Sequence, residues 1–389
     1  MKDTKITENI KYIGVDDKEI RLFEGQYDVP NGISYNSYLI LDQAVVIMDT
    51  VDKRATDEWF NNLINELDGR YPDYLVISHL EPDHAYNIQK LANKYPNMRL
   101  IGNAKTFMYL PQFFEIPNLE ERKIVVNEGD IISIGKHTLQ FFMAPMVHWP
   151  EVMVTYEQSE KILFAADGFG KFGTLDTDED WTCEARRYYF NIVGKYGPQV
   201  QALLKKTSTL DIKIICPLHG PILKDNLEYY IQKYDIWSKY EPEDDGVFIA
   251  YASIHGYTKE TALKLAKILE EKGAKKVTTT DLTTDDMAEA IEDAFRYDKI
   301  ILAASSYNNG LFPPMEQFLH HLESKNYQNR KIGIIENGTW APSAARCMKD
   351  IINKMKDIII CNTTITIKSK MNEKNIEELN TLADEILNK

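Results

Sequence analysis

Apolar and polar positions follow two different patterns along this chain. Over roughly the first 240 residues, short apolar runs recur at irregular intervals, for example at residues 74–77, 162–166 and 214–218. Runs of this length are typical of buried β-strands and are too short for buried helices. This part of the chain is therefore predicted to hold many short strands.

Beyond residue 246 the apolar runs are separated by segments with helical periodicity. In residues 258–272, Ala262, Leu265 and Leu269 share one helix face, and Gly273 closes the end. Strands are predicted at residues 247–252, 276–281, 299–304, 331–336 and 357–367. Strands that alternate with helices indicate a doubly wound parallel sheet.

The change of pattern falls at residues 239–246. Pro242, Gly246 and a cluster of acidic residues follow a helical run that ends near Trp237. Such a combination is typical of a linker. We expect an α/β protein with two domains, residues 1–243 and residues 244–389.

The densest group of chemically competent side chains is His79, Glu81, Asp83 and His84, directly after the predicted strand 74–77. Carboxylates combined with imidazoles form a hard, anionic ligand set that suits iron or manganese better than zinc. A solvated loop is the alternative, with Asp83 as the N-cap of a helix that starts near residue 85.

Three further candidate ligands, His148, Asp167 and His219, follow the apolar runs 139–147, 162–166 and 214–218, each of which is predicted to be a strand. Taken alone, a histidine at a strand end is more often a surface or satisfied core residue than a ligand. Together with the first cluster, however, the set is too large for one ion and fits two metals that share a carboxylate. Asp167 is the natural bridge, because it lies between the two histidines in sequence and offers two oxygens.

Three loops at the carboxyl ends of predicted strands in the second part carry hydroxyl, amide and aromatic side chains. Backbone N–H groups and hydroxyls at the start of a helix bind phosphate, and ligands of such sheets bind at this edge. The first loop has no lysine, which favours a monophosphate such as FMN over a nucleoside triphosphate. Helix caps and, for Trp340, ordinary edge packing are the alternatives. The candidate FMN-binding residues are Ser253, Ile254, His255, Gly256, Tyr257, Thr258, Ser305, Tyr307, Asn308, Asn309, Gly310, Asn337, Gly338, Thr339, Trp340 and Ala341.

Composition narrows the function classes. With 45 Lys plus Arg against 59 Asp plus Glu, the net charge of −14 argues against nucleic acid or an anionic membrane as a partner, although solubility alone explains an acidic surface. No apolar stretch approaches the ~20 residues of a membrane span. The polar start of the chain leads us to expect no signal peptide and a cytoplasmic protein. The 4 cysteines form no C-x-x-C motif, so we expect neither a disulfide framework nor a built-in rubredoxin.

The strand-and-loop pattern of the first part resembles the metallo-β-lactamase fold, an αββα sandwich with metals at the sheet edge. Hydrolases of that fold carry H-x-H-x-D-H and bind zinc. Glu81 in place of the second histidine resembles the flavodiiron proteins instead. The second part resembles flavodoxin, so the similarity extends over essentially the whole chain. Residues 30–39, 148–151, 168–173 and 196–200 also resemble that family.

The resemblance implies two non-haem irons and FMN. His79, Glu81 and His148 would bind one iron, Asp83, His84 and His219 the other, and Asp167 would lie between them; all of these except His84 are also predicted to be catalytic. The implied reaction is reduction of O2 to water, of NO to N2O, or both, with electrons from a separate rubredoxin-like donor. It also implies a head-to-tail homodimer or a dimer of dimers. Phe23, Tyr27, Trp149 and Tyr196 are candidates to line the substrate pocket.

Two other functions stay open at this point. The first is a zinc hydrolase with an appended flavodoxin-like domain, which metal analysis and a hydrolysis assay would reveal. The second is an electron carrier or sensor whose diiron site is a vestige, which lack of steady-state turnover would reveal.

Overall fold

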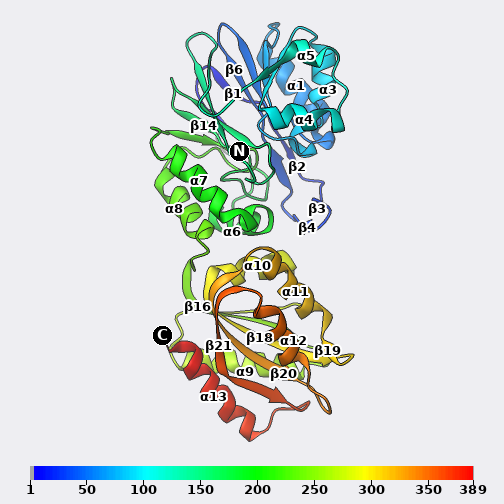
Figure 1. Ribbon diagram of the computed structural model, residues 1–389, viewed down its shortest axis with the longest axis vertical. Coiled ribbons are helices and arrows are strands. Elements are labelled where there is room, and N and C mark those ends of the chain that lie inside the picture. The colour runs from blue at the N-terminus through cyan, green and yellow to red at the C-terminus, as the bar shows by residue number, and fades with distance from the viewer. Residues whose placement is uncertain (1–3, 389) are drawn as a thin grey trace. The chain divides into compact units, whose positions relative to one another are not determined.

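The computed structural model describes residues 4–388, which form two compact units (Figure 1). The first unit runs up to Tyr189 and includes Pro198–Asp235. The second comprises Phe190–Gly197 and the described chain from Ile236 onward. Residue 243 as the end of the first domain remains our proposal.

The first unit contains two sheets of mixed direction. In the first sheet the order is β1, β6, β7, β8, β9 and β10; β1, β6 and β7 pair antiparallel, and β7 to β10 pair parallel. These strands are β1 (Ile10–Tyr12), β6 (Tyr38–Leu41), β7 (Val45–Met48), β8 (Tyr74–Val76), β9 (Arg99–Gly102) and β10 (Lys123–Val125).

The second sheet has the order β11 to β15, antiparallel except for the parallel pair β14 and β15. Its strands are β11 (Ile131–Ser133), β12 (Thr138–Met143), β13 (Met153–Glu157), β14 (Ile162–Phe164) and β15 (Ile214–Cys216). Two small ribbons, β2 (Val15–Asp17) with β5 (Ile33–Tyr35) and β3 (Leu22–Phe23) with β4 (Tyr27–Asp28), accompany the two sheets.

The core of the first unit lies between these sheets. Side chains of both, such as Val46 and Met48 from the first and Phe141 and Phe164 from the second, form one buried cluster. Helices lie outside the two sheets, as the predicted sandwich requires (Figure 1). They are α1 (Thr56–Leu67), α2 (Pro82–Ala85), α3 (Ile88–Lys94), α4 (Ala104–Phe113), α5 (Leu119–Arg122), α6 (Trp181–Tyr188), α7 (Gly197–Thr207) and α8 (Leu227–Ser238).

The predicted strands before the candidate ligands are too long. The run 139–147 is a strand only as far as Met143, because Pro145 has no N–H for a ladder and Met146 has a left-handed backbone, with φ of 66°. The run 162–166 likewise ends at Phe164, and Ala166 has φ of 49°. His148 and Asp167 therefore each follow a turn that leaves the sheet.

The second unit is built on a parallel sheet with the order β17, β16, β18, β20 and β21. This is the doubly wound arrangement that the alternating pattern predicted. Its strands are β16 (Asp244–Ala252), β17 (Val277–Asp281), β18 (Tyr297–Tyr307), β20 (Gln328–Asn337) and β21 (Lys356–Ile367), with β19 (Gly310–Leu311) antiparallel to β18.

Helices cover both faces of this sheet (Figure 1). On one face, Leu265 and Leu269 of α9 pack in the same core cluster as Leu379 and Leu382 of α13. The helices are α9 (Tyr257–Glu271), α10 (Met287–Arg296), α11 (Pro313–Ser324), α12 (Ala344–Ile352) and α13 (Glu373–Leu387). The expected helix 258–272 is thus present, one residue earlier.

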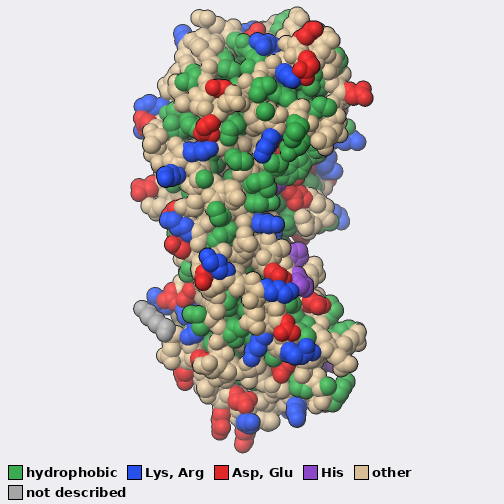
Figure 2. Space-filling view, in the orientation of Figure 1, with side chains coloured by type: hydrophobic (Ala, Val, Ile, Leu, Met, Phe, Trp, Pro, Cys, Tyr) green, Lys and Arg blue, Asp and Glu red, His purple; other side chains and the backbone are tan. Residues whose placement is uncertain are grey.

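On the face that Figure 2 shows, acidic and basic side chains are interspersed over the described residues. On this face, the acidic side chains of the described residues therefore form no single continuous patch. Among the described helices, none is both long enough and apolar enough to cross a membrane.

Candidate functional site

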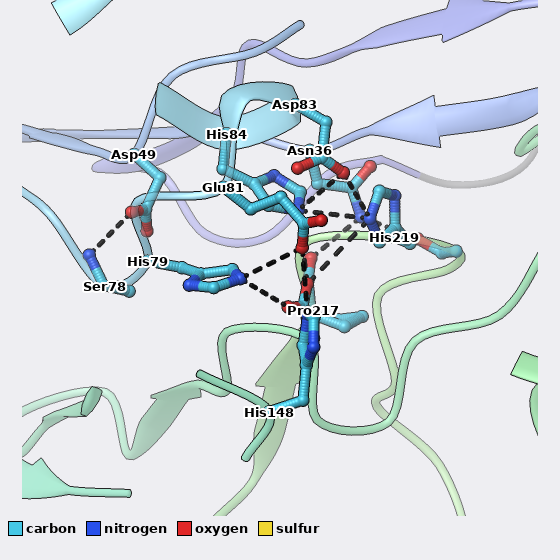
Figure 3. Close-up of polar contacts among 12 residues, drawn as sticks. Asn36, Asp49, Ser78, His79, Glu81, Asp83, His84, His148, Pro217 and His219 are labelled. Atoms are coloured by element: carbon cyan, nitrogen blue, oxygen red, sulfur yellow. Dashed lines mark hydrogen bonds and ion pairs between the residues drawn. The ribbon is translucent and has the colours of Figure 1, made fainter. Parts of the chain in front are cut away.

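The predicted ligands come together in the first unit, although they come from four separate loops (Figure 3). The ligand atoms of each group lie within 4.8 Å of one another. The first group is His79, Glu81, His148 and Asp167, and the second is Asp83, His84 and His219. The family resemblance implied the same two groups, except that it placed Asp167 between them and not in the first group.

Asp167 nevertheless faces both groups. Its Oδ2 lies 3.4 Å from Nε2 of His79 and 3.5 Å from Nε2 of His148. Its Oδ1 lies 3.2 Å from Nε2 of His84 and 3.9 Å from Nε2 of His219. One oxygen is thus directed to each group, which is the geometry of a bridging carboxylate.

The second group is equally close-packed, and His84 points into it (Figure 3). Nε2 of His84 is 3.1 Å from Nε2 of His219, and both nitrogens are 3.2 Å from Oδ2 of Asp83. Two imidazole nitrogens at this distance are stabilised by a shared proton or by a shared cation.

The donor set fits two metal ions. Asp83 and Asp167 are buried, yet none of their carboxylate oxygens takes part in a hydrogen bond. Burying a carboxylate without hydrogen bonds is costly unless it is paired with cations or binds metal. Three carboxylates and four imidazoles also make the hard, anionic set that favours iron or manganese.

The helix-cap alternative for Asp83 is wrong. The helix begins at Pro82 rather than near residue 85, and Glu81 is its N-cap residue. Proline fits the first helical position because the N–H that it lacks has no partner there. Asp83 is consequently inside the first turn, and its carboxylate is free to face the cluster.

Two of the histidines are oriented by partners on the side of the ring that faces away from the cluster. These partners are the Glu151 carboxylate and the backbone carbonyl of Ser34. Nδ1 of His79 lies 2.9 Å from Oε1 of Glu151, and Nδ1 of His219 lies 2.7 Å from the Ser34 carbonyl oxygen. A partner on Nδ1 leaves Nε2 to face the cluster, as in metal sites whose ligands are held by an outer shell. Sequence reasoning assigned Glu151 no role, since a contact across 72 positions leaves no local pattern.

Other hydrogen bonds fix the loops that carry the ligands. The N–H of Ser78, next to His79, donates to Oδ1 of Asp49 at 2.6 Å. Nδ2 of Asn36 donates to the carbonyls of Pro217 and Gly220, each at 2.8 Å, on either side of His219. These bonds hold the ligands in place before any metal binds.

The cluster holds protons that a metal would displace. Burial raises the pKa of Asp83 to about 7, with Glu81 and Asp167 adding to the rise against the effect of His84. Burial disfavours the charged form of His148, but contacts with Asp167 and Glu81 outweigh it and raise its pKa to about 9. Burial also disfavours ionised Asp167, yet His84 and His148 hold its pKa well below the usual range.

Aromatic rings surround the cluster. Trp149 lies edge-on to His79 at 5.1 Å between ring centroids, and Phe23 lies edge-on to His219 at 5.4 Å. Tyr188, which the sequence did not single out, is 5.5 Å from His219. Tyr27 contacts Phe172, and Tyr196 belongs to the second unit. Aromatic rings thus border both ligand groups.

The second unit has a cavity of about 460 Å³ at the carboxyl ends of β16, β18 and β20. This volume lies in the range of cofactor sites. Its lining contains all of the candidate FMN-binding residues except Gly256 and Gly310, and it adds Ser306 and Ser369. Ser369 follows β21, and no residue after that strand was predicted to bind FMN.

The cavity suits a phosphate and a flat ring. The start of the 15-residue helix α9 lies at one end, where Oγ1 of Thr258 and Oγ of Ser305 are 2.9 Å apart. Trp340 is 89% exposed and Tyr307 is 46% exposed, so both rings have surface available to cover a bound ring system.

Gly256 and Gly310 are not among the cavity-lining residues, but their backbone conformations shape two of its loops. Gly256 starts α9 with φ of 90°, a conformation that glycine adopts readily. Gly310 pairs with Tyr307 across a tight turn in which Asn308 and Asn309 both have positive φ. Asparagine is common in such hairpin turns.

The two parts match two known families. A family model described as "ODP family beta lactamase" matches residues 33–220, and one described as "Flavodoxin domain" matches residues 248–360. They fall on the parts predicted to be metallo-β-lactamase-like and flavodoxin-like, and they confirm both predictions.

Related proteins match nearly the whole chain. An uncharacterized protein of Methanocaldococcus jannaschii is 31% identical over 389 residues, which cover 96% of this chain and 95% of that protein. An anaerobic nitric oxide reductase flavorubredoxin of Vibrio vulnificus is 28% identical over 94% of this chain and 75% of its own length.

Solved structures agree with these matches. The rubredoxin oxygen:oxidoreductase of Desulfovibrio gigas has a TM-score of 0.91 at 26% identity, covering 99% of this chain and 97% of that one. A point mutant of the flavo di-iron protein of Thermotoga maritima has a TM-score of 0.89 at 26% identity, covering 100% of this chain and 98% of that one.

Proposed function

The chain belongs to the flavodiiron protein family, and we propose that it reduces O2 to water, NO to N2O, or both, at a diiron centre supplied with electrons by FMN. The observation that carries this proposal is the pair of ligand groups that face the two oxygens of Asp167. Similar proteins are named for reduction of NO and of oxygen.

His79, Glu81 and His148 would hold one iron, and Asp83, His84 and His219 the other, with Asp167 between them. The irons, when bound, would supply two adjacent redox centres at which a diatomic molecule takes up electrons. The Glu151 carboxylate would fix the orientation of His79. Trp149 and Phe23 would exclude water from the reacting centre.

In the second unit, the cavity would hold FMN. The start of α9 and the Thr258 and Ser305 hydroxyls would bind its phosphate, and Trp340 and Tyr307 would cover its ring. A rubredoxin-type protein is the donor that the names of similar proteins suggest.

A zinc hydrolase is not favoured. Glu81 brings a third carboxylate to the cluster, and a hydrolase has no need of the flavodoxin-like part. The ligand geometry opposes a vestigial site in an electron carrier or sensor. Both ligand groups are complete, and each contains a histidine whose Nδ1 has a hydrogen-bond partner outside the cluster.

We also propose a head-to-tail homodimer in the cytoplasm. Four free cysteines fit a reducing compartment. Mixing a His79→Ala protein with one that cannot bind FMN tests the dimer. Activity regained through mixed dimers is the expected result. Failure to regain activity despite proven subunit exchange would mean that electrons pass within one chain.

The function itself is tested by gas consumption. Purified protein should contain about two irons and one FMN per chain, and it should consume O2 or NO when a reduced rubredoxin is supplied. Zinc in a colourless protein that hydrolyses lactams or thioesters would instead establish the hydrolase.

A further inference from the structure

A small apolar cavity lies in the first unit between the second sheet and α7. It measures about 20 Å³, and Val147, Ala165, Gly168, Val200 and Leu203 are among its lining residues. Helices α7 and α8 lie near β14 on this side of the unit (Figure 1). The cavity is separate from the ligand cluster, since none of the seven candidate ligands lines it.

The cavity and the cluster share two loops as walls. Val147 directly precedes His148 in one loop. In the other loop, Ala165 and Gly168 flank Asp167 and the residue before it. The residues of this second loop are small. Gly168 has no side chain, and a Cβ at this position would meet the Ala165 carbonyl oxygen at 2.9 Å. The loop that carries Asp167 therefore forms part of the cavity wall, where Ala165 contributes a methyl group and Gly168 its backbone.

The lining offers few hydrogen-bond partners to a water molecule. Its two side-chain hydroxyls belong to Thr207 and Tyr234. Oγ1 of Thr207 donates to the Leu203 carbonyl at 3.1 Å, and Oη of Tyr234 accepts from the Phe169 N–H at 2.6 Å. A buried water needs two to four polar partners, whereas apolar cavities stay dry and bind apolar atoms such as xenon.

The cavity has a deep end and a shallow end. Val147, Ala165 and Gly168 are buried, whereas Leu203 and Leu204 of α7 are only half-buried. A small molecule that enters between these leucines would thus move from the surface toward the loops that carry His148 and Asp167.

We propose that this cavity binds the diatomic gas and delivers it to the diiron centre, an inference that rests on the proposed function and deepens it. The space exceeds the roughly 10–15 Å³ that one water-sized molecule requires. O2 and NO are small and nearly apolar, so they partition into such a lining, while water and ions do not.

Xenon tests occupancy without any turnover. Crystals of the iron- and FMN-loaded protein are pressurised with xenon, and anomalous scattering locates the gas. We expect a xenon atom bounded by Val147, Ala165 and Leu203. An empty cavity under xenon pressure overturns the inference and leaves gas reduction untouched.

Plugging the shallow end tests delivery. Leu203→Trp fills the mouth, and Ala202→Trp places the same ring one position away at an exposed site. We expect a several-fold loss of kcat/KM for O2 and NO in the first variant only, with kcat at saturating gas, iron and FMN content unchanged, and with xenon lost from the cavity.

Equal kcat/KM in the two tryptophan variants, with xenon displaced by the first, would overturn delivery through this cavity. If Leu203→Trp does not fold, Leu204→Trp, at the other half-buried leucine of the lining, takes its place in the same comparison. Absence of gas consumption by the wild type would overturn the proposed function itself, and with it the role of the cavity.

Discussion

Nδ1 of His79 lies 2.9 Å from Oε1 of Glu151, and both residues are fully buried. The same oxygen accepts the Leu80 N–H at 3.0 Å. Burial tends to raise the pKa of Glu151, but the contact with His79 outweighs it and lowers the pKa. An ionised partner of this kind makes an imidazole a stronger metal ligand and fixes which nitrogen faces the metal.

Replacing Glu151 with glutamine should weaken iron binding by about 10- to 100-fold, because the neutral amide no longer supports the His79 imidazole. Iron affinity is measured by chelator competition on the anaerobic protein. Glu157→Gln is the matched control, since Glu157 is also fully buried but accepts bonds from the N–H groups of Ser159 and Glu160. Equal affinity in both variants would show that Glu151 does not support the ligand.

Asp167→Ala should lose more iron than His84→Ala. Asp167 faces both ligand groups, whereas His84 belongs to one, so removal of the carboxylate affects both ions. Iron per chain is measured by elemental analysis. His137→Ala controls for loss of a buried histidine, because His137 bonds Asp42 away from the cluster. If Asp167→Ala kept as much iron as the wild type, the bridging role would be wrong.

Iron binding to the metal-free protein should strengthen as the pH rises from about 6 to 9. Asp83, with its pKa raised to about 7, and His148, with its pKa raised to about 9, are protonated below those values in the metal-free protein. Iron binds only the deprotonated forms, so affinity falls as the pH falls through each pKa, and binding releases protons. Anaerobic titrations in weak buffer measure both effects. Affinity independent of pH, without proton release, would contradict this account.

Trp340→Ala should weaken FMN binding by about 0.5–1.5 kcal/mol, or roughly two- to tenfold in Kd. The ring is 89% exposed beside the cavity, so its removal leaves the fold intact and deletes a contact with the cofactor alone. Kd is measured by titrating FMN with the FMN-free protein and following the quenching of flavin fluorescence. Tyr71→Ala, at a 76% exposed ring in the first unit, is the control. An unchanged Kd in Trp340→Ala would remove this residue from the flavin site.

The main features of the candidate site could be predicted because they are local in sequence. The spacing of His79, Glu81, Asp83 and His84 after a strand is visible along the chain, and strand ends meet at one edge of a sheet. The alternation of strands and helices after residue 246 specified the parallel sheet in the same way.

Other features depend on contacts between distant segments, and these leave no such pattern. Glu151 and Ser369 acquire their places only when the sheets assemble. The end of β12 at Met143 was missed because the apolar character of residues 144–147 continues past Pro145, which cannot donate to a ladder. Gly256 and Gly310 stay predicted FMN contacts, and both also shape the loops beside the cavity.

Anaerobic turnover with a defined electron supply tests the central claim most directly. The protein is given NADH, a rubredoxin reductase and a rubredoxin, and O2 and NO are titrated separately while products are measured. We expect little turnover with NADH alone, rapid gas consumption with the full system, and water or N2O as the product. An iron-depleted sample of the same protein, still containing FMN, should be inactive. Peroxide formed in proportion to the O2 consumed, at a rate unchanged by iron removal, would show that the flavin simply autoxidises and would contradict reduction at a diiron centre.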